Sequence, residues 1–168
     1  IGYIDGIVMG ELSLIYIICA SSSSSQPLLR MVQDKFSNVI VFEGIESIPD
    51  LSEFNTSDRK FVIFDDLLLD KKKVFEEDYQ RARHKNISLI YCSQAFHMTP
   101  SFIRKNCTYI CILRLGGGTR EINTIIRDYG FDMDKKQLYK MYQYCTKEQF
   151  NYLMIDLIVP IEKRFRKF

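Results

Sequence analysis

The chain has 168 residues, of which 46% are hydrophobic and 26% are charged. This length is sufficient for one domain with a sizeable core, and this composition excludes general disorder. The net charge is only +2, so bulk charge gives no argument for nucleic-acid binding, although a local basic patch is compatible with it. We expect a single domain over residues 1–168 that ends in a basic tail over residues 161–168.

The cysteines and the apolar runs bear on the compartment of the protein. There are five cysteines without a CxxC pair, and Cys19, Cys92 and Cys111 lie within apolar runs. This pattern predicts reduced, buried thiols in a cytosolic compartment rather than a disulfide frame or a zinc site. The apolar run over residues 12–20 is too short to span a bilayer, and no secretory signal is evident, so we expect a protein that is neither secreted nor bound to a membrane.

The run from Leu12 to Cys19 predicts a buried strand. It is followed by Ala20, five serines, Gln26 and Pro27, and helical spacing resumes at Leu28. A strand, a loop of small residues and a helix start form the order of a phosphate-binding loop, in which backbone N–H groups and the helix N-terminus hold an anion.

The amino-acid sequence of this loop departs from the pattern GxxxxGK[ST]. The four defining positions of the pattern fall on Ala20, Ser25, Gln26 and Pro27. Gln26 brings no positive charge to a phosphate, and Pro27 offers neither a hydroxyl nor a backbone N–H, although it is a good first residue of a helix. Two interpretations remain open. One is a serine-rich connection without a ligand; the other is a phosphate-binding loop made of Ser21, Ser22, Ser23, Ser24, Ser25, Gln26 and Pro27.

The most informative strand is Phe61 to Phe64, because it ends on the adjacent carboxylates Asp65 and Asp66. An apolar run of this kind predicts a strand covered on both faces, and ligands bind at the carboxyl edge of such sheets. In the functional interpretation Asp65 holds Mg²⁺ through water, and Asp66 orients or deprotonates an attacking water. In the structural interpretation one of the two carboxylates caps the next helix.

Another apolar strand, Ile87 to Cys92, is followed by Gln94. Beside the strand that ends on Asp65 and Asp66, this amide could sense a γ-phosphate or position a water. The alternative is a turn residue that hydrogen-bonds locally.

The remaining pattern alternates strands with helices. Strands are predicted at Val39–Phe42, Tyr109–Leu113 and 150–157, and helices at 68–83, at 102–104, at Arg120–Asp128, at Asp134–Tyr144 and from Thr146 onward. At the end of the chain, basic residues surround Phe165 and could hold a nucleic-acid backbone, although a solvated tail is the commoner arrangement. These candidate DNA-binding residues are Lys163, Arg164, Arg166 and Lys167.

Taken in order, these motifs resemble the genome-packaging ATPases of large double-stranded DNA viruses, virophages and the related Maverick/Polinton elements, which belong to the FtsK–HerA branch of P-loop motors. The residues that carry the resemblance are Asp65-Asp66, the stretch from Arg83 to Ser88, Ser93-Gln94 and Arg104-x-Asn106. The resemblance spans nearly the whole chain. It implies an α/β fold, a three-layer P-loop NTPase-like domain with a mainly parallel central sheet.

The resemblance also implies roles for residues. Asp65 is the expected Walker B acid on Mg²⁺, Asp66 the catalytic carboxylate, and Gln94 the polar sensor beside the γ-phosphate of ATP. Arg83 is the first candidate for the arginine finger that reaches into the site of a neighbouring subunit, and Arg81 and Arg104 are further candidates. The alternative for Arg83 is a surface arginine.

The implied function is ATP hydrolysis, with ATP and Mg²⁺ as cofactors, coupled to translocation of double-stranded DNA into a preformed capsid. The expected partners are the other subunits of a homo-oligomeric ring and capsid or portal-like components, in the viral factory of the host cytoplasm or in the virion. One alternative is a catalytically inactive homologue that acts as a structural or DNA-contacting subunit. Another is an α/β domain that holds a simple anion at a helix N-terminus.

Overall fold

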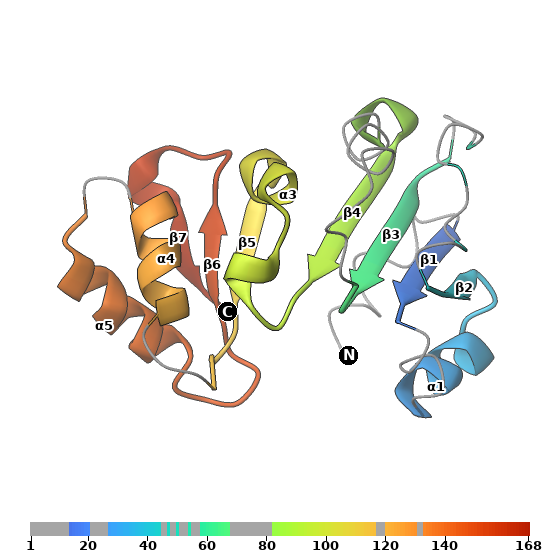
Figure 1. Cartoon of the computed structure of the whole chain (residues 1–168), viewed down its shortest axis with the longest axis horizontal. Coiled ribbons are helices and arrows are strands. Elements are labelled where there is room, and N and C mark those ends of the chain that lie inside the picture. The colour runs from blue at the N-terminus through green and yellow to red at the C-terminus, as the bar shows by residue number, and fades with distance from the viewer. Residues whose placement is uncertain are drawn as a thin grey trace. The chain divides into compact units, whose positions relative to one another are not determined.

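The structure is a computed structural model of the chain that describes residues 14–20, 27–44, 47, 50, 54, 58–67, 82–116, 120–130 and 133–168. It divides into two compact units, Ile1–Gln94 and Ala95–Phe168, and each unit has its own sheet (Figure 1). Organisation as a single domain over residues 1–168 stays a prediction.

Four parallel strands form the sheet of the first unit in the order β2-β1-β3-β4. Their apolar residues are nearly continuous because the faces of a parallel sheet are usually both covered. This arrangement confirms the predicted mainly parallel sheet. The strands are β1 (Leu14–Cys19), β2 (Val39–Glu43), β3 (Lys60–Asp65) and β4 (Ile87–Cys92).

Helix α1 (Pro27–Lys35) packs its buried Leu29 against alternate residues of β1. Because side chains alternate along a strand, Ile15 and Ile17 share one face and join Leu29 in the same core cluster. Phe64 is fully buried, and burial of a side chain of this size stabilises the fold by about 1.5–3 kcal/mol. The predicted strand and the helix start at Pro27 are therefore observed in their expected order, and residues 21–26 between them lie outside the described residues.

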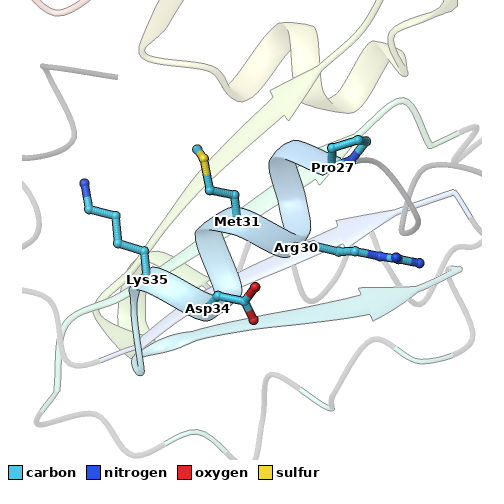
Figure 2. A pocket seen from close by; sticks show the side chains of 5 residues that line it. All are labelled: Pro27, Arg30, Met31, Asp34 and Lys35. Atoms are coloured by element: carbon cyan, nitrogen blue, oxygen red, sulfur yellow. The ribbon is translucent and has the colours of Figure 1, made fainter.

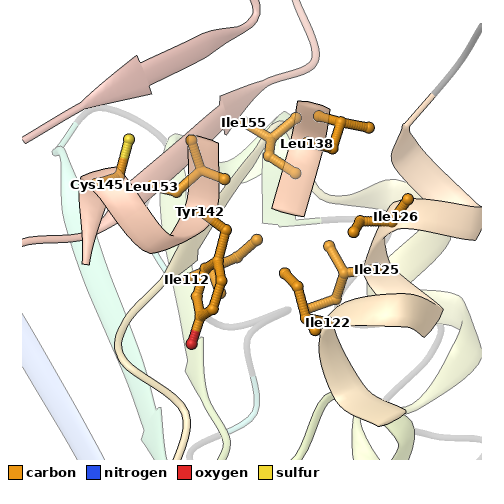
Figure 3. Packing of buried hydrophobic residues seen from close by; sticks show 9 residues of the cluster. All are labelled: Ile112, Ile122, Ile125, Ile126, Leu138, Tyr142, Cys145, Leu153 and Ile155. Atoms are coloured by element: carbon orange, nitrogen blue, oxygen red, sulfur yellow. The ribbon is translucent and has the colours of Figure 1, made fainter. Parts of the chain in front are cut away.

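The second unit is built on an antiparallel sheet in the order β5-β6-β7. Helices α4 and α5 contribute the apolar residues that meet this sheet, and Figure 3 shows Ile122, Ile125 and Ile126 of α4 opposite Leu138 and Tyr142 of α5. The elements are α3 (Ser101–Asn106), β5 (Tyr109–Ile112), α4 (Arg120–Tyr129), α5 (Lys135–Cys145), β6 (Leu153–Asp156) and β7 (Phe165–Lys167), with short 3₁₀ helices at Phe96–Met98 and Ile161–Lys163.

The predicted helices over 120–128 and 134–144 are confirmed. Asp134 is the N-cap of α5, and its side chain accepts a hydrogen bond from the Gln137 N–H at 3.3 Å. The helix predicted from Thr146 is wrong, because the Thr146 N–H and hydroxyl both donate to the Tyr142 carbonyl at 2.9 Å and so complete the last turn of α5. The helix predicted over 68–83 falls mostly outside the described residues.

The strand predicted at Tyr109–Leu113 is observed as β5, and it pairs with β6 in the antiparallel sheet. One further expectation about this unit is wrong. The end of the chain is a strand, β7, rather than a solvated tail, because residues Phe165–Lys167 pair with β6.

All five cysteines are free. Cys19 and Cys145 are buried as predicted, whereas Cys92 and Cys111 are exposed, so the predicted burial was wrong for these two. Both occupy alternate positions in strands whose outer face meets solvent. Among the helices of the described residues, none is both long and apolar enough to cross a bilayer.

Glu121 gives the second unit a pH-dependent contact. Its carboxylate accepts the His97 backbone N–H at 3.3 Å and pairs with the His97 ring. Burial alone raises the pKa of Glu121, but the hydrogen bonds and the charge of His97 outweigh burial and hold the pKa below its usual value. A folded pKa that is lowered stabilises the fold above the ordinary glutamate pKa of about 4.3, and this contribution is lost as the pH falls through the folded value.

We therefore expect the free energy of unfolding to fall between about pH 5 and pH 3, and to fall less in Glu121→Gln, which lacks the titrating group. Urea unfolding across this pH range, followed by circular dichroism, measures both curves. Parallel pH profiles for the two proteins would show that the contact with His97 contributes nothing to stability.

Candidate active site at the carboxyl edge of the parallel sheet

The four parallel strands end in register, so their last residues form a row along one edge of the sheet. Glu43 is paired with Cys19, Cys19 with Asp65, and Asp65 with Cys92. Neighbouring strands lie about 4.8 Å apart, which puts the backbones of Glu43 and Asp65 about 10 Å from each other. Carboxylates therefore come from two strands of this edge. Glu43 was not among the site residues predicted from the sequence, although it ends an apolar strand in the same manner as Asp65.

Asp66 leaves β3 in a left-handed backbone conformation, with φ of 53°. Aspartate tolerates this conformation better than most residues, and such outliers are frequent at functional sites. The Asp66 N–H donates to the Cys92 carbonyl at 3.3 Å, so the turn is tied to the end of β4. The Asp66 carboxylate is exposed beyond the edge of the sheet.

Gln94 lies against this carboxylate: its side-chain amide donates to Asp66 Oδ2 at 2.7 Å. The contact joins residues 28 positions apart, so Gln94 is more than a locally bonded turn residue. The structure thus brings together Asp66 and Gln94, which follow the neighbouring strands β3 and β4.

Cys19 forms an uncharged neighbour of Asp65. Burial raises the pKa of the Cys19 thiol, and the charges of Asp65 and Glu43 raise it further. The thiol is fully buried and remains protonated at neutral pH, since even the ordinary thiol pKa is about 8.5. The carboxylates of this edge therefore have no thiolate beside them on β1.

The structure describes only the residues on either side of the predicted phosphate-binding loop. Ser21, Ser22, Ser23, Ser24, Ser25 and Gln26 lie outside the described residues, and Pro27 is the first residue of α1. The loop leaves the carboxyl end of β1, beside Asp65, and enters the N-terminus of a nine-residue helix. Free N–H groups and the helix dipole make such a terminus attractive to anions.

A shallow hollow runs along α1 and is lined by five of its residues, Pro27, Arg30, Met31, Asp34 and Lys35 (Figure 2). Its lining carries both signs of charge and includes none of the carboxylates at the sheet edge. We assign no function to this hollow.

The two described candidates for an arginine finger lie in different settings. The Arg83 backbone belongs to a short 3₁₀ helix, Arg83–Lys85, that precedes β4, and its side chain and the whole of Arg81 lie outside the described residues. Since β4 rises about 3.3 Å per residue, Arg83 lies roughly 17 Å or more from the carboxyl edge. Arg83 therefore stands at the opposite edge of the sheet from Asp66.

Arg104 is held within the second unit. Its Nε donates to the Thr99 carbonyl at 3.0 Å, its terminal nitrogen lies 3.4 Å from Asp128, and its guanidinium lies 5.2 Å from the centre of the Phe96 ring. These contacts give Arg104 a structural role.

The four basic residues near the end of the chain differ in their contacts. Arg166 donates to Asp156 at 2.9 Å, and Arg164 donates to the Val159 carbonyl at 2.9 Å, so both stabilise the connection between β6 and β7. Lys163 is exposed, and the ammonium group of Lys167 lies 4.6 Å from the centre of the Tyr144 ring.

The carboxylates of Asp65 and Asp66 at the sheet edge are candidate ligands for Mg²⁺. Within the described residues there is no group of three or more His, Cys, Asp or Glu side chains that could enclose a metal ion. Mg²⁺ commonly binds through one or two carboxylates together with water and substrate phosphates. Asp65 and Asp66 fit that mode.

Comparison with known proteins gives the family. Residues 12–162 match the family model described as Poxvirus A32 protein. The chain belongs to this family. Membership in the Poxvirus A32 protein family confirms the resemblance to viral packaging ATPases. No curated protein matches the chain.

Solved structures of viral packaging proteins share the fold of this family member. The genome packaging NTPase B204 from Sulfolobus turreted icosahedral virus 2 in complex with ATPγS is 17% identical, with a TM-score of 0.61 over 98% of this chain and 85% of that one. The complex of the same NTPase with AMP is 15% identical, with a TM-score of 0.59 over 99% of this chain and 89% of that one. B204, the DNA-packaging ATPase from Sulfolobus Turreted Icosahedral Virus, is 12% identical, with a TM-score of 0.53 over 94% of this chain and 97% of that one. These likenesses confirm the predicted α/β fold of the P-loop NTPase type.

Proposed function

We propose that this member of the Poxvirus A32 protein family is a viral DNA-packaging ATPase that couples ATP hydrolysis to translocation of double-stranded DNA into the capsid. Family membership and the shared fold support this function. The observation in the structure that carries it is the contact between Asp66 and Gln94 at the carboxyl edge of the parallel sheet, directly after Asp65.

Each residue at this edge has a distinct role in the proposal. Mg²⁺ bound with ATP supplies positive charge to the phosphate oxygens. Asp65, at the end of β3, holds the ion directly or through water. Asp66 orients the attacking water and accepts its proton, and Gln94 fixes the Asp66 carboxylate through the hydrogen bond of 2.7 Å. The phosphates lie at the N-terminus of α1, over residues 21–27.

The loop sequence favours a second candidate, a catalytically inactive homologue that serves as a structural or DNA-contacting subunit. Gln26 replaces the lysine and Pro27 the hydroxyl residue of GxxxxGK[ST], so two groups that stabilise charge on phosphates are absent from the loop. Binding of a simple anion alone has no such support once the family is known.

ATP hydrolysis by the purified chain separates these candidates. We expect turnover that requires Mg²⁺, stops with EDTA and rises when duplex DNA is added, because a translocation motor couples hydrolysis to its substrate. Phosphate release measured with and without each component gives the result. Absence of turnover under all conditions, with binding of duplex DNA retained, would establish the inactive homologue.

The position of Arg83 fits action on a neighbouring subunit, because its backbone lies at the opposite edge of the sheet from Asp66. In the proposal the chain forms a homo-oligomeric ring that engages capsid or portal-like components, in the viral factory or in the virion. An arginine finger supplied by a neighbour contributes roughly 10³- to 10⁵-fold to turnover.

We therefore expect Arg83→Ala and Asp66→Asn to be inactive separately and to recover part of the activity when mixed. In mixed rings some interfaces combine an intact Arg83 from one subunit with an intact Asp66 from the next. ATPase assays across mixing ratios measure the recovery, with Arg114→Ala as an exposed arginine control that keeps full activity. A mixture as inactive as its components would contradict the role in trans.

A further inference from the structure

The two units of the chain carry net charges of opposite sign, which nearly cancel in the net charge of the whole chain. Residues 1–94 contain 10 Lys and Arg against 14 Asp and Glu, a net charge of −4, whereas residues 95–168 contain 13 against 7, a net charge of +6. A polyanion such as DNA is therefore attracted to the second unit and repelled by the first.

Helix α5 carries three of the thirteen Lys and Arg residues of the second unit, namely Lys135, Lys136 and Lys140. Its sequence from Lys135 to Cys145 contains no acidic residue. Leu138, Tyr142 and Cys145 form the buried side of this helix, as Figure 3 shows, and the opposite side is exposed. Lys136, Lys140 and Tyr144 follow one another at intervals of four residues, so they form one stripe with a spacing of about 6 Å.

Five of the seven acidic side chains of this unit contact groups other than the lysines of the stripe, and one of the five, Glu148, lies beside Lys147 in the sequence and contacts Asn151. Asp156 is paired with Arg166, Asp128 with Arg104 and Arg127, and Glu121 with His97. Asp134 caps α5. Within the part of the chain that the structure describes, no ion pair involves Lys136, Lys140 or Lys147.

Residues beyond α5 extend the stripe. Lys147 is exposed in the turn after the helix, and the Lys167 ammonium of β7 lies 4.6 Å from the centre of the Tyr144 ring. The Tyr144 side chain is 66% exposed, so helix and sheet together present a cation and an aromatic ring at one place. This combination is typical of surfaces that contact nucleic-acid backbones and sugars.

Phe150 adds an exposed aromatic ring at an energetic cost. It is 81% exposed and adopts φ of 69° in the turn between α5 and β6. The turn is held by the Asn151 N–H and side-chain amide, which donate to the Glu148 carbonyl at 3.3 Å and carboxylate at 3.2 Å. A left-handed backbone is strained for phenylalanine, and glycine or asparagine would be the more stable choice for folding alone.

We propose that this surface, made of Lys136, Lys140, Tyr144, Lys147, Phe150 and Lys167 and named here the α5 surface, binds the phosphodiester backbone of duplex DNA. The lysines contact phosphates, and the two aromatic rings pack against the sugars. The inference rests on the proposed function for the choice of duplex DNA as the polyanion, whereas the charge and the exposed rings are properties of the second unit alone. It adds a DNA contact on α5 to the basic residues at the end of the chain.

The test compares two double variants with the same change in charge. For binding that releases counterions, the slope of log K against log salt changes by about 0.9 for each phosphate contact. Lys136→Gln with Lys140→Gln should therefore lower the slope by about 2, and Lys105→Gln with Arg120→Gln, exposed cations on α3 and α4, should leave it unchanged. Binding of a 30-base-pair duplex without ATP, measured by fluorescence anisotropy from 50 to 300 mM salt, gives the slopes. Equal slopes for the two variants would overturn the proposal.

Phe150→Gly distinguishes a binding role from a structural one. Glycine accepts φ of 69° without strain, so we expect the melting temperature to stay the same or rise while the affinity for the duplex falls several-fold. Unchanged affinity would remove Phe150 from the surface. A tenfold preference for a single strand of equal length would overturn the assignment to duplex DNA.

Two further readouts separate DNA binding by the α5 surface from self-association and from ATP hydrolysis. Sedimentation measures oligomeric state, and a change of assembly in the α5 lysine variant with an unchanged salt slope would make the surface a contact between copies of the chain and overturn DNA binding. Hydrolysis of ATP without DNA tests the proposed function by itself, and its absence together with the predicted slopes would leave the α5 surface standing.

Discussion

Replacement of Asp66 by asparagine is expected to lower ATP turnover by about 10²- to 10⁴-fold, the usual contribution of a general base. Asparagine keeps the shape of the side chain and an oxygen that can accept the hydrogen bond from Gln94, but it cannot accept a proton at neutral pH. Nucleotide binding should change little, because in the proposed mechanism Asp66 acts on the water rather than on the phosphates.

Asp58→Asn is the matched control. Asp58 precedes β3 and lies at the opposite end of that strand from Asp66, so the same chemical change there should leave turnover intact. Steady-state phosphate release and nucleotide binding by calorimetry measure the two effects. Full turnover in Asp66→Asn, or an equal loss in both variants, would contradict the assigned role.

Rebuilding the loop is the second change with a large expected effect. Ala20→Gly, Ser25→Gly, Gln26→Lys and Pro27→Ser together restore the pattern GxxxxGK[ST]. One well-placed electrostatic donor is worth on the order of 3 kcal/mol in the transition state, so we expect turnover to rise by about 10²-fold. The gain should depend on Mg²⁺ and disappear when Asp66→Asn is added.

A triple variant that omits Gln26→Lys controls for loop flexibility, since it gains both glycines without the positive charge. It should recover only a small part of the increase. Equal rates for the original chain and the rebuilt one would show that residues 21–27 already stabilise the phosphates. Inactivity of every variant, with the ring assembled, would argue against the motor function.

Much of the first unit could be predicted because its sequence signals are local. Each strand is a continuous apolar run, and polar residues follow β3 and β4 directly. Since parallel strands in one sheet end at the same edge, the meeting of Asp66 with Gln94 follows from the order of the motifs once the two strands are neighbours.

Other features depend on pairing between distant segments and could not be predicted. Three residues are too few for a periodic signal, so β7 became visible only through its pairing with β6. The left-handed conformation of Phe150 has no sequence signature, because glycine or asparagine is expected at such positions. Thr146 resembled a helix start, yet its hydroxyl completes the preceding helix instead.

The central claim, that nucleotide and Mg²⁺ meet at the carboxyl edge of the parallel sheet, is tested most directly by a crystal structure of the protein with ATPγS and Mg²⁺. We predict that the ion lies beside Asp65, bound directly at about 2.1 Å or through one water, and that the γ-phosphate faces Asp66 and Gln94. We also predict that the β-phosphate approaches the N-terminus of α1. Nucleotide bound elsewhere, for example in the hollow along α1, with no ion at Asp65, would contradict the claim.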